Sequence, residues 1–370
     1  MFLIERLVGV GTFIAILLFV CFLISTCKSN KRLRFVLFLY TIVLAILGFF
    51  YVPYVTADLY RIYQTLDYFK TLNFSVLMDR YGESSTIVAN IYYWLISKTG
   101  ENRLLPAITA FVCYNCIFYI VGKTAKIYNV SRKNTALSVF FIMSVGFFMG
   151  MISGIRSTLA ICLIAYCFFR ETVEKKFRPH HILLYVMAAF IHNFAVVIIA
   201  IRLIIPLFSK NMKRWKKCVY LAFIAVLLIF AMRNFNSLLE SVFEKATEYI
   251  TGDMYSYGWG YLKDSLMLFV TIYFLRNLYK VTKGENNTLD QTKIFSYVLV
   301  IIAIVFSFEY SIFSRTTNVL LPIISTPCLM VSLEKRKSPE AFNTILLFSI
   351  AIMILSFTRG SMCSYKFFVL

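Results

Sequence analysis

Two arginines could carry chemistry. Arg156 lies in the apolar run 150–160, where its only polar company is hydroxyl groups, and Arg315 follows the stretch 310–314 at the end of a predicted span. Inside a membrane, a lone arginine costs about 2.5 to 3.5 kcal/mol on insertion scales, so it is expected to face a cavity or an anion. The planar guanidinium suits phosphate, which it can bind through two parallel hydrogen bonds. The alternatives are that Arg156 only reaches from a helix end to the surface and that Arg315 forms a plain salt bridge with Glu309.

Two further side chains have the chemistry to orient or move a proton. His192 lies in the apolar run 188–194, where a neutral imidazole can act as a general base or hydrogen-bond a sugar. Glu83 follows Tyr81 and Gly82, and its carboxylate can take a proton from an attacking sugar hydroxyl. A structural histidine at a helix break and a solvated glutamate are the respective alternatives. With only three histidines and no carboxylate cluster, the chain is not expected to bind a metal.

An aromatic and glycine-rich stretch, 233–263, offers flat side chains. It contains Tyr257 and Trp259 among several tyrosines and glycines. Such rings can stack on sugars, or they can sit among lipid headgroups. We expect this stretch to be an external loop, and both readings of its aromatic residues stay open.

The composition requires a membrane around these residues. Of 370 residues, 60% are hydrophobic and 15% are charged, whereas a soluble domain carries about 25% charged residues. Apolar runs long enough to cross a bilayer core of about 30 Å recur along the chain. The first run, 7–26, is followed by basic residues and lacks a cleavage site, so it is predicted to be a retained anchor. We therefore expect one polytopic domain over 1–370, an all-α integral membrane protein with about 10–12 transmembrane helices.

Ten full spans are predicted from these runs. They lie near 7–26, 35–54, 104–121, 135–151, 155–170, 218–232, 264–280, 293–309, 316–333 and 341–357.

Basic residues predict the orientation of the spans. Six short loops that alternate with the spans hold 24 of the 38 lysines and arginines: 28–34, 123–133, 170–178, 209–217, 276–293 and 335–337. The positive-inside rule makes that side cytoplasmic and places the polar candidates at the outer ends of the spans. The net charge of +20 is explained by these loops, and no basic helix or aromatic groove motif accompanies it, so nucleic acid is not an expected partner.

Two regions depart from simple spans. The mixed polar and aromatic segment 57–103 is predicted to form external interfacial helices with one re-entrant piece at 84–97. The run 182–208 would be about 40 Å long as a single helix, yet one crossing would strand the basic cluster 210–217 outside. We therefore predict a shallow helix hairpin, broken near His192 and Asn193. The preceding His180 and His181 are expected in a basic loop, without a role in chemistry.

Taken together, these residues resemble a known family, the EpsG-like and Wzy-type polysaccharide polymerases of bacterial envelopes. The resemblance is carried by Gly154-Ile155-Arg156 with Leu159-Ala160, by Ala188 to His192, by Phe313-Ser314-Arg315 and by Tyr365 to Phe368. The chain departs from the family pattern where Ser157 replaces a glutamine and where Ser84 and Ser85 follow Glu83.

The resemblance implies a substrate and a place of action. The substrate would be an undecaprenyl-pyrophosphate-linked oligosaccharide, whose repeat units are joined outside the bacterial cytoplasmic (inner) membrane into O-antigen, capsule or exopolysaccharide. No nucleotide or metal cofactor is implied. The other expected partners are the lipid bilayer and, as a further candidate, a chain-length regulator protein.

The resemblance also implies roles for individual residues. Arg156 and Arg315 would hold the pyrophosphate, with Ser157, Tyr257 and Trp259 as further substrate contacts. His192, or alternatively Glu83, would orient or deprotonate the acceptor hydroxyl.

Three other functions stay open at this stage. A flippase for the same lipid-linked sugars would need polar residues reachable from both faces and often shows an internal repeat, which this sequence lacks. An O-antigen-ligase-like glycosyltransferase would share the donor and differ in the acceptor. An acyltransferase would need a histidine with an acidic partner near a cytosolic entrance.

Overall fold

The computed structural model of the protein describes residues 2–55, 57–144, 147–208, 215, 217–222, 258–282 and 289–358. Within these residues all regular structure is helical. Among them, 5 helices are long and apolar enough to cross a membrane: Val8–Thr26, Asn30–Phe49, Leu104–Ile127, Ile312–Arg336 and Pro339–Phe357. The protein is an all-α integral membrane protein, as predicted.

The helices follow the chain in a simple order. They are α1 (Phe2–Thr26), α2 (Asn30–Phe49), α3 (Asp58–Lys70), α4 (Phe74–Tyr81), α5 (Ile87–Ser97), α6 (Leu104–Ile127), α7 (Arg132–Ser144), α8 (Phe147–Ser153), α9 (Ile155–Thr172), α10 (Pro179–Ile191), α11 (Phe194–Ile204), the 3₁₀-helix η1 (Ile205–Phe208), α14 (Gly258–Thr282), α15 (Asp290–Val305), α16 (Tyr310–Arg315), the π-helix η2 (Thr316–Leu320), α17 (Leu321–Arg336) and α18 (Pro339–Thr358).

Most predicted spans correspond to one helix, and two differ. The predicted span 135–151 covers two helices, α7 and α8, and the predicted span 316–333 begins with the π-helix η2 before α17. The predicted span 218–232 lies largely outside the described residues. The count of 10–12 crossings therefore stays a prediction, while the helical membrane fold is established.

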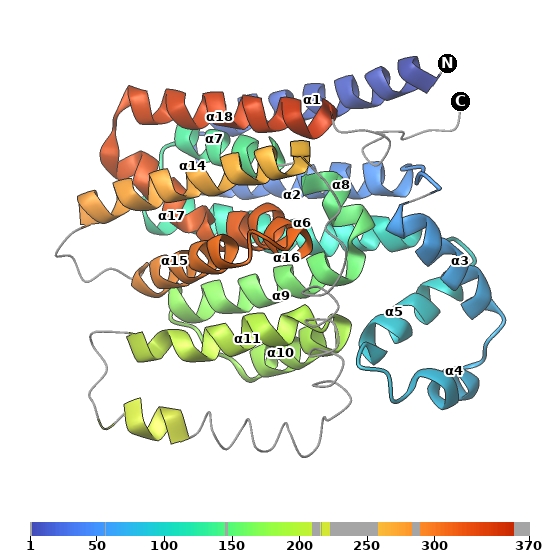
Figure 1. Ribbon diagram of the computed structural model, residues 1–370. Helices are drawn as coiled ribbons and strands as arrows, with labels where there is room; N and C mark the ends of the chain where they lie inside the picture. The colour runs from blue at the N-terminus through green and yellow to red at the C-terminus, as the bar shows by residue number, and fades with distance from the viewer. Residues whose placement is uncertain are drawn as a thin grey trace.

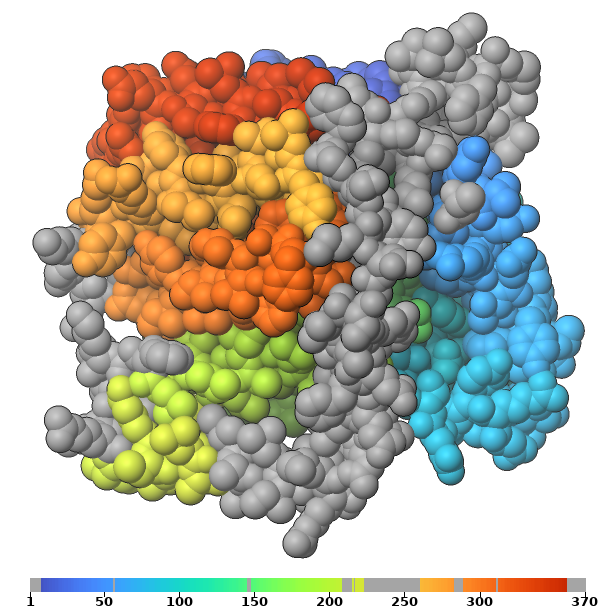
Figure 2. Space-filling view, viewed as in Figure 1, coloured from blue at the N-terminus to red at the C-terminus, as the bar shows by residue number. Residues whose placement is uncertain are grey.

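The long helices lie side by side with their axes along a common direction (Figure 1). α2 packs on α6, α14 on α17, α9 on α10 and α1 on α7. On the face shown in Figure 2, the C-terminal helices in red and orange adjoin the green helices that follow α8. The short helices α3, α4 and α5 extend from one end of this bundle, on the right of Figure 1.

Three of the loops predicted to be cytoplasmic meet at the opposite end. Arg132 Nη2 donates to Asn30 Oδ1 at 2.8 Å, which joins the first two of these loops. The backbone N–H of Ser131 donates to Glu334 Oε2 at 2.7 Å, which joins the second loop to the end of α17. The prediction that these loops share one side of the protein is thus confirmed, and its identity as the cytoplasmic side rests on their positive charge.

The hairpin predicted over 182–208 is present. Glu171, near the end of α9, accepts hydrogen bonds at Oε2 from Arg202 Nε (3.1 Å) and Nη2 (2.5 Å). Its other oxygen, Oε1, lies 3.5 Å from His181 Nδ1. Arg202 belongs to the last turn of α11 and His181 to the first turn of α10, so both helix ends meet the same carboxylate. α10 therefore runs away from this end, the chain breaks at His192 and Asn193, and α11 returns.

One expectation for this region was wrong. His181 was predicted in a solvated loop, but it stands on α10 and is fully buried. Beside it, Glu174 accepts a hydrogen bond from Tyr119 (2.8 Å) and pairs with Lys123 (3.1 Å). Carboxylates at and just after the end of α9 thus pair with Arg202 of α11 and Lys123 of α6.

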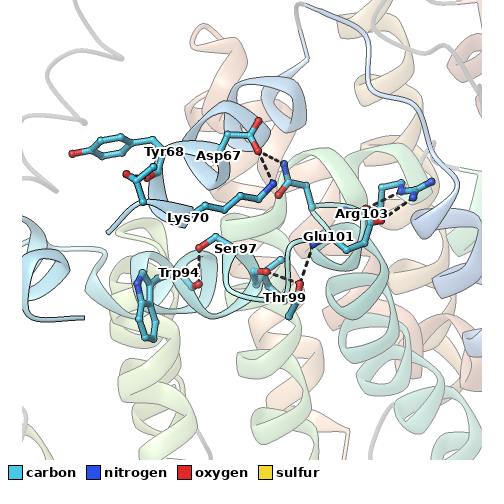
Figure 3. A network of polar contacts seen from close by, with 11 residues as sticks. Asp67, Tyr68, Lys70, Trp94, Ser97, Thr99, Glu101 and Arg103 are labelled. Atoms are coloured by element: carbon cyan, nitrogen blue, oxygen red, sulfur yellow. Dashed lines mark hydrogen bonds and ion pairs between the residues drawn. The ribbon is translucent and has the colours of Figure 1, made fainter. Parts of the chain in front are cut away.

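The segment 57–103 forms a small polar-linked unit (Figure 3). Asp67 Oδ1 on α3 accepts hydrogen bonds from Lys70 Nζ and from Asn102 Nδ2, each at 2.9 Å. Trp94 Nε1 on α5 donates to the carbonyl of Leu72 at 2.9 Å. With 11 residues, α5 is about 16 Å long, which is too short to cross a bilayer core of about 30 Å. Its length agrees with the re-entrant or interfacial prediction.

Candidate functional site

Arg156 is held in the first turn of α9 by a tight turn at Gly154. Thr158 Oγ1 donates to the carbonyl oxygens of Met151 (3.1 Å) and Gly154 (3.0 Å), which ties α8 to α9. A Cβ atom on Gly154 would lie 2.9 Å from the carbonyl oxygen of Gly150, closer than real Cβ contacts. Only glycine fits this turn without a shift of the backbone. Arg156, two residues after the turn, is exposed.

His192 stands at the break between α10 and α11, in an extended conformation with φ −154° and ψ 126°. Its Nδ1 accepts a hydrogen bond from the backbone N–H of Phe194 at 3.1 Å. A ring nitrogen that accepts a hydrogen bond carries no proton, so a neutral His192 has its proton on Nε2. This assignment follows from the hydrogen-bond partner. Nε2–H is then the hydrogen-bond donor of the ring.

Arg315 is the last residue of α16 and directly precedes the π-helix η2. Short π-helical turns inside helices often occur at functional sites. Asn318 Nδ2, within η2, donates to Ser314 Oγ at 2.9 Å and to Asp264 Oδ1 at 2.7 Å. Asp264 belongs to α14 and is fully buried, so these bonds fix the backbone around Arg315 against a neighbouring helix.

Glu309, the possible counter-ion of Arg315, makes a hydrogen bond at the start of the helix that carries this arginine. Its Oε2 accepts the backbone N–H of Ile312 at 2.6 Å, across the first turn of α16. A carboxylate in this position stabilises the start of a helix. Glu309 thus helps to set the direction of the short helix that carries Arg315.

The structure brings Arg156, His192 and Arg315 together, although more than 100 residues separate the last two in sequence. The positive charges of Arg315 and of Arg156 both act on the imidazole of His192. The three residues belong to the start of α9, the α10–α11 break and the end of α16. They lie at the end of α9 away from Glu171. Guanidinium groups and an imidazole N–H are groups that can bind a pyrophosphate.

A family model matches most of the chain. The EpsG family model matches residues 54–368, which include all three residues of the group. The chain belongs to the EpsG family. Membership in the EpsG family confirms the resemblance seen in the sequence and indicates a polymerase-like role in polysaccharide biosynthesis, in a bacterial inner membrane. No curated protein and no solved structure gives a significant match.

The other predicted site residues of this EpsG-family chain lie elsewhere or are engaged locally. Ser157 Oγ donates to the carbonyl of Gly154 at 2.9 Å and so stabilises the turn before Arg156. Glu83 follows α4 and has an exposed side chain. Tyr257 lies outside the described residues. Trp259 is in the first turn of α14, and its side chain lies outside the described part. Their roles stay predictions.

Two residues near the group, Tyr93 and Asp264, were missed from the sequence. The phenol of Tyr93, on α5, interacts electrostatically with Arg156 and with Asp58 of α3. Nothing distinguished Tyr93 from its aromatic neighbours in 57–103. Asp264 did leave a signal, because a carboxylate inside an apolar helix is costly and usually functional.

Among the described residues, no three His, Cys, Asp or Glu side chains form a group suited to a metal ion.

Proposed function

We propose that this EpsG-family chain is a polymerase that joins undecaprenyl-pyrophosphate-linked oligosaccharide repeat units on the outer face of the cytoplasmic membrane. The observation that supports the proposal is the group formed by Arg156, His192 and Arg315 at one end of the bundle. That end lies opposite the basic loops, so the positive-inside rule makes it the outer end.

The reaction that fits this group is a glycosyl transfer. A hydroxyl oxygen of the acceptor unit attacks the anomeric carbon of the donor sugar. The bond from that carbon to the pyrophosphate oxygen breaks, and its electron pair stays on the lipid pyrophosphate. Negative charge grows on the pyrophosphate in the transition state, and Arg156 and Arg315 stabilise it there. A single displacement inverts the anomeric configuration.

His192 contributes as a donor in this scheme. Because Nδ1 accepts the Phe194 N–H, the imidazole presents Nε2–H to the substrate and orients an oxygen of the pyrophosphate or sugar. The proton of the attacking hydroxyl then passes to another acceptor, for which Glu83 is the candidate carboxylate, or to water. Of the two roles considered for His192, orienting the substrate and deprotonating the acceptor hydroxyl, this scheme assigns it the first.

The opposite end of the bundle favours a polymerase over a flippase. A flippase would need polar groups that substrate can reach from both faces. At the inner end the carboxylates of the α9–α11 region are engaged with protein cations, Glu171 with Arg202 and Glu174 with Lys123. The described residues thus place Arg156, His192 and Arg315 at one end of the bundle and these ion-paired carboxylates at the other.

The test is the envelope polysaccharide of a strain that lacks the gene, complemented with variants of the chain. Arg156→Lys and Arg315→Lys keep the charge and remove the planar fork, so long polymer should be lost while protein abundance stays normal. Arg34→Lys, an exposed arginine at the predicted inner end, is the matched control and should restore polymer.

The lipid intermediates distinguish the functions. Single lipid-linked repeat units on the outer face would support the polymerase. Single units trapped on the inner face would indicate a flippase. Long chains that stay attached to lipid would indicate a ligase, and an unchanged profile in both arginine variants would overturn the proposed site.

A further inference from the structure

Near the arginine group, one buried hydroxyl makes no hydrogen bond to the described residues. Tyr93 is 4% exposed, and its hydroxyl has no hydrogen-bond partner among the described residues. Leaving a buried polar group unpaired costs about 1 to 3 kcal/mol. Buried polar atoms without partners are uncommon, and each one requires an explanation.

The position of Tyr93 offers an explanation for its unpaired hydroxyl. It shares the buried face of α5 with Ala89 and Ile96. α5 packs against α3 and against α10, the helix that ends at His192. The Tyr93 phenol interacts electrostatically with Arg156. The unpaired hydroxyl therefore lies at the end of the bundle where the proposed pyrophosphate would sit.

Neighbouring tyrosines show that this combination is specific. The hydroxyl of Tyr92, the next residue, is bonded to Thr109 Oγ1 (3.0 Å) and to the carbonyl of Leu105 (3.3 Å). Tyr63 also has a buried hydroxyl without a hydrogen-bond partner among the described residues, but the charges that act on it belong to Glu101 and Arg103, not to Arg156. Of Tyr63, Tyr92 and Tyr93, only Tyr93 has both a hydroxyl without a hydrogen-bond partner among the described residues and an electrostatic interaction with Arg156.

We propose that Tyr93 is a further substrate-binding residue, whose hydroxyl donates a hydrogen bond to an oxygen of the pyrophosphate held by Arg156. This inference rests on the proposed function and adds a residue from the α3–α5 unit to its site. An O–H donor to an anionic oxygen forms a short, strong hydrogen bond, stronger than one between neutral groups. The substrate oxygen would supply the hydrogen-bond partner that the described residues do not provide.

Removing the hydroxyl separates a binding role from a structural one. If Tyr93 had only a packing role, Tyr93→Phe would keep the ring, delete an unsatisfied polar atom and leave stability unchanged or raised. If it binds substrate, the same variant weakens binding while the fold stays intact.

The experiment uses the full chain purified in detergent micelles, with inorganic pyrophosphate as the probe. The rise in melting temperature with pyrophosphate concentration gives an apparent Kd. We expect Tyr93→Phe to raise this Kd about 10-fold or more, with an unchanged or higher melting temperature in the absence of pyrophosphate. Tyr92→Phe and Tyr63→Phe are the matched controls and should keep the Kd of the unmodified chain.

The outcomes that would overturn the inference are distinct from failure of the proposed function. An unchanged Kd in Tyr93→Phe, with clear binding by the unmodified chain, removes Tyr93 from the site and leaves the arginine group standing. An equal loss in Tyr63→Phe would assign the effect to the α3–α5 unit as a whole and would also overturn the inference. If the unmodified chain does not respond to pyrophosphate, the pyrophosphate site itself is contradicted and Tyr93 falls with it.

Discussion

The side-chain amide of Asn318 donates a hydrogen bond of 2.7 Å to Oδ1 of the fully buried Asp264. Asn318 lies in the π-helix η2, directly after Arg315, and Asp264 lies in α14. The same amide also donates to Ser314 Oγ at 2.9 Å. The backbone on both sides of Arg315 is thus tied to a second helix, which restricts where its guanidinium can reach.

Replacing Asp264 tests this restraint. Asp264→Ala deletes the acceptor and leaves a buried amide with one partner fewer, so we expect a loss of about 1 to 3 kcal/mol in stability and a strong loss of polymer. Asp264→Asn keeps an oxygen that can accept from Asn318 and should recover most of both. The readouts are melting temperature in detergent and polymer length on gels. Equal polymer in the alanine variant would contradict the positioning role.

The turn before Arg156 provides a second prediction. Gly154→Ala places a Cβ 2.9 Å from the Gly150 carbonyl oxygen, so the turn must shift and move Arg156. We expect polymer synthesis to fall at least 10-fold, because small misplacements of binding groups have large effects on rate. Gly150→Ala is the matched control, since its Cβ would meet no atom within 4 Å. It should retain full activity and, in a helix, gain about 0.5 to 1 kcal/mol. Equal activity of the two variants would contradict this reading.

The ion pair that closes the hairpin predicts a stability effect. Glu171→Gln leaves the guanidinium of Arg202, with 16% of its side chain exposed, without its charged partner. Breaking a buried pair from one side costs about 3 kcal/mol or more. We expect lower abundance and faster proteolysis between α9 and α11. Glu340→Gln, on an exposed residue of α18, is the control. Normal abundance of Glu171→Gln would show that the hairpin does not depend on this pair.

A pH effect is expected in the turn between α5 and α6. Arg103 donates two hydrogen bonds of 2.8 Å to Glu101 and holds the pKa of that carboxyl at about 2. In an unfolded turn the pKa would be about 4.3. Because the folded pKa is the lower one, ionised Glu101 stabilises the turn fully above about pH 4.3, and this contribution is lost as the pH falls toward 2. The effect is small, because both side chains are partly exposed.

Hydrogen exchange measures this effect. Protection of the amides in 98–104 should decrease between about pH 4.3 and 2, after correction for the intrinsic exchange rate. Glu101→Gln should show no such step. A step that persists in the glutamine variant would assign it to another carboxyl group.

The helices, and the placement of the basic loops on one side, were predictable from the sequence because a bilayer permits few backbone structures and orientations. Apolar runs of about 20 residues must become helices, and basic loops must gather on one side. The break at His192 was predictable for a related reason, since a single crossing would have placed five cations on the wrong side. The structure confirms both.

Local backbone details were beyond the reach of hydropathy. The division of 135–151 into α7 and α8 falls within a mostly apolar run, and the π-helix after Arg315 begins with Thr316, Thr317 and Asn318. Neither feature has a hydropathy pattern that distinguishes it from an ordinary α-helix. The burial of His181 depends on Glu171 and its partners, which come from three helices. Side-chain pairing across helices carries no periodic signal in one sequence.

The candidate site was predictable only in part. Arg156, His192 and Arg315 were found because a charged or titratable group in an apolar run is costly and conspicuous. Tyr93 was missed because tyrosine is common at membrane interfaces and its missing hydrogen bond is visible only in three dimensions. Asp264 carried the same signal as the arginines and should have been considered.

The central claim is that this EpsG-family chain polymerises lipid-linked repeat units by itself. The most direct measurement is a reconstitution, in which the purified chain in proteoliposomes receives lipid-linked single units extracted from the strain that lacks it, without nucleotide. The account predicts a ladder of longer lipid-linked chains from the unmodified protein and only single units from Arg156→Lys and Arg315→Lys. Single units left unchanged by the unmodified protein, or a full ladder from both arginine variants, would contradict it.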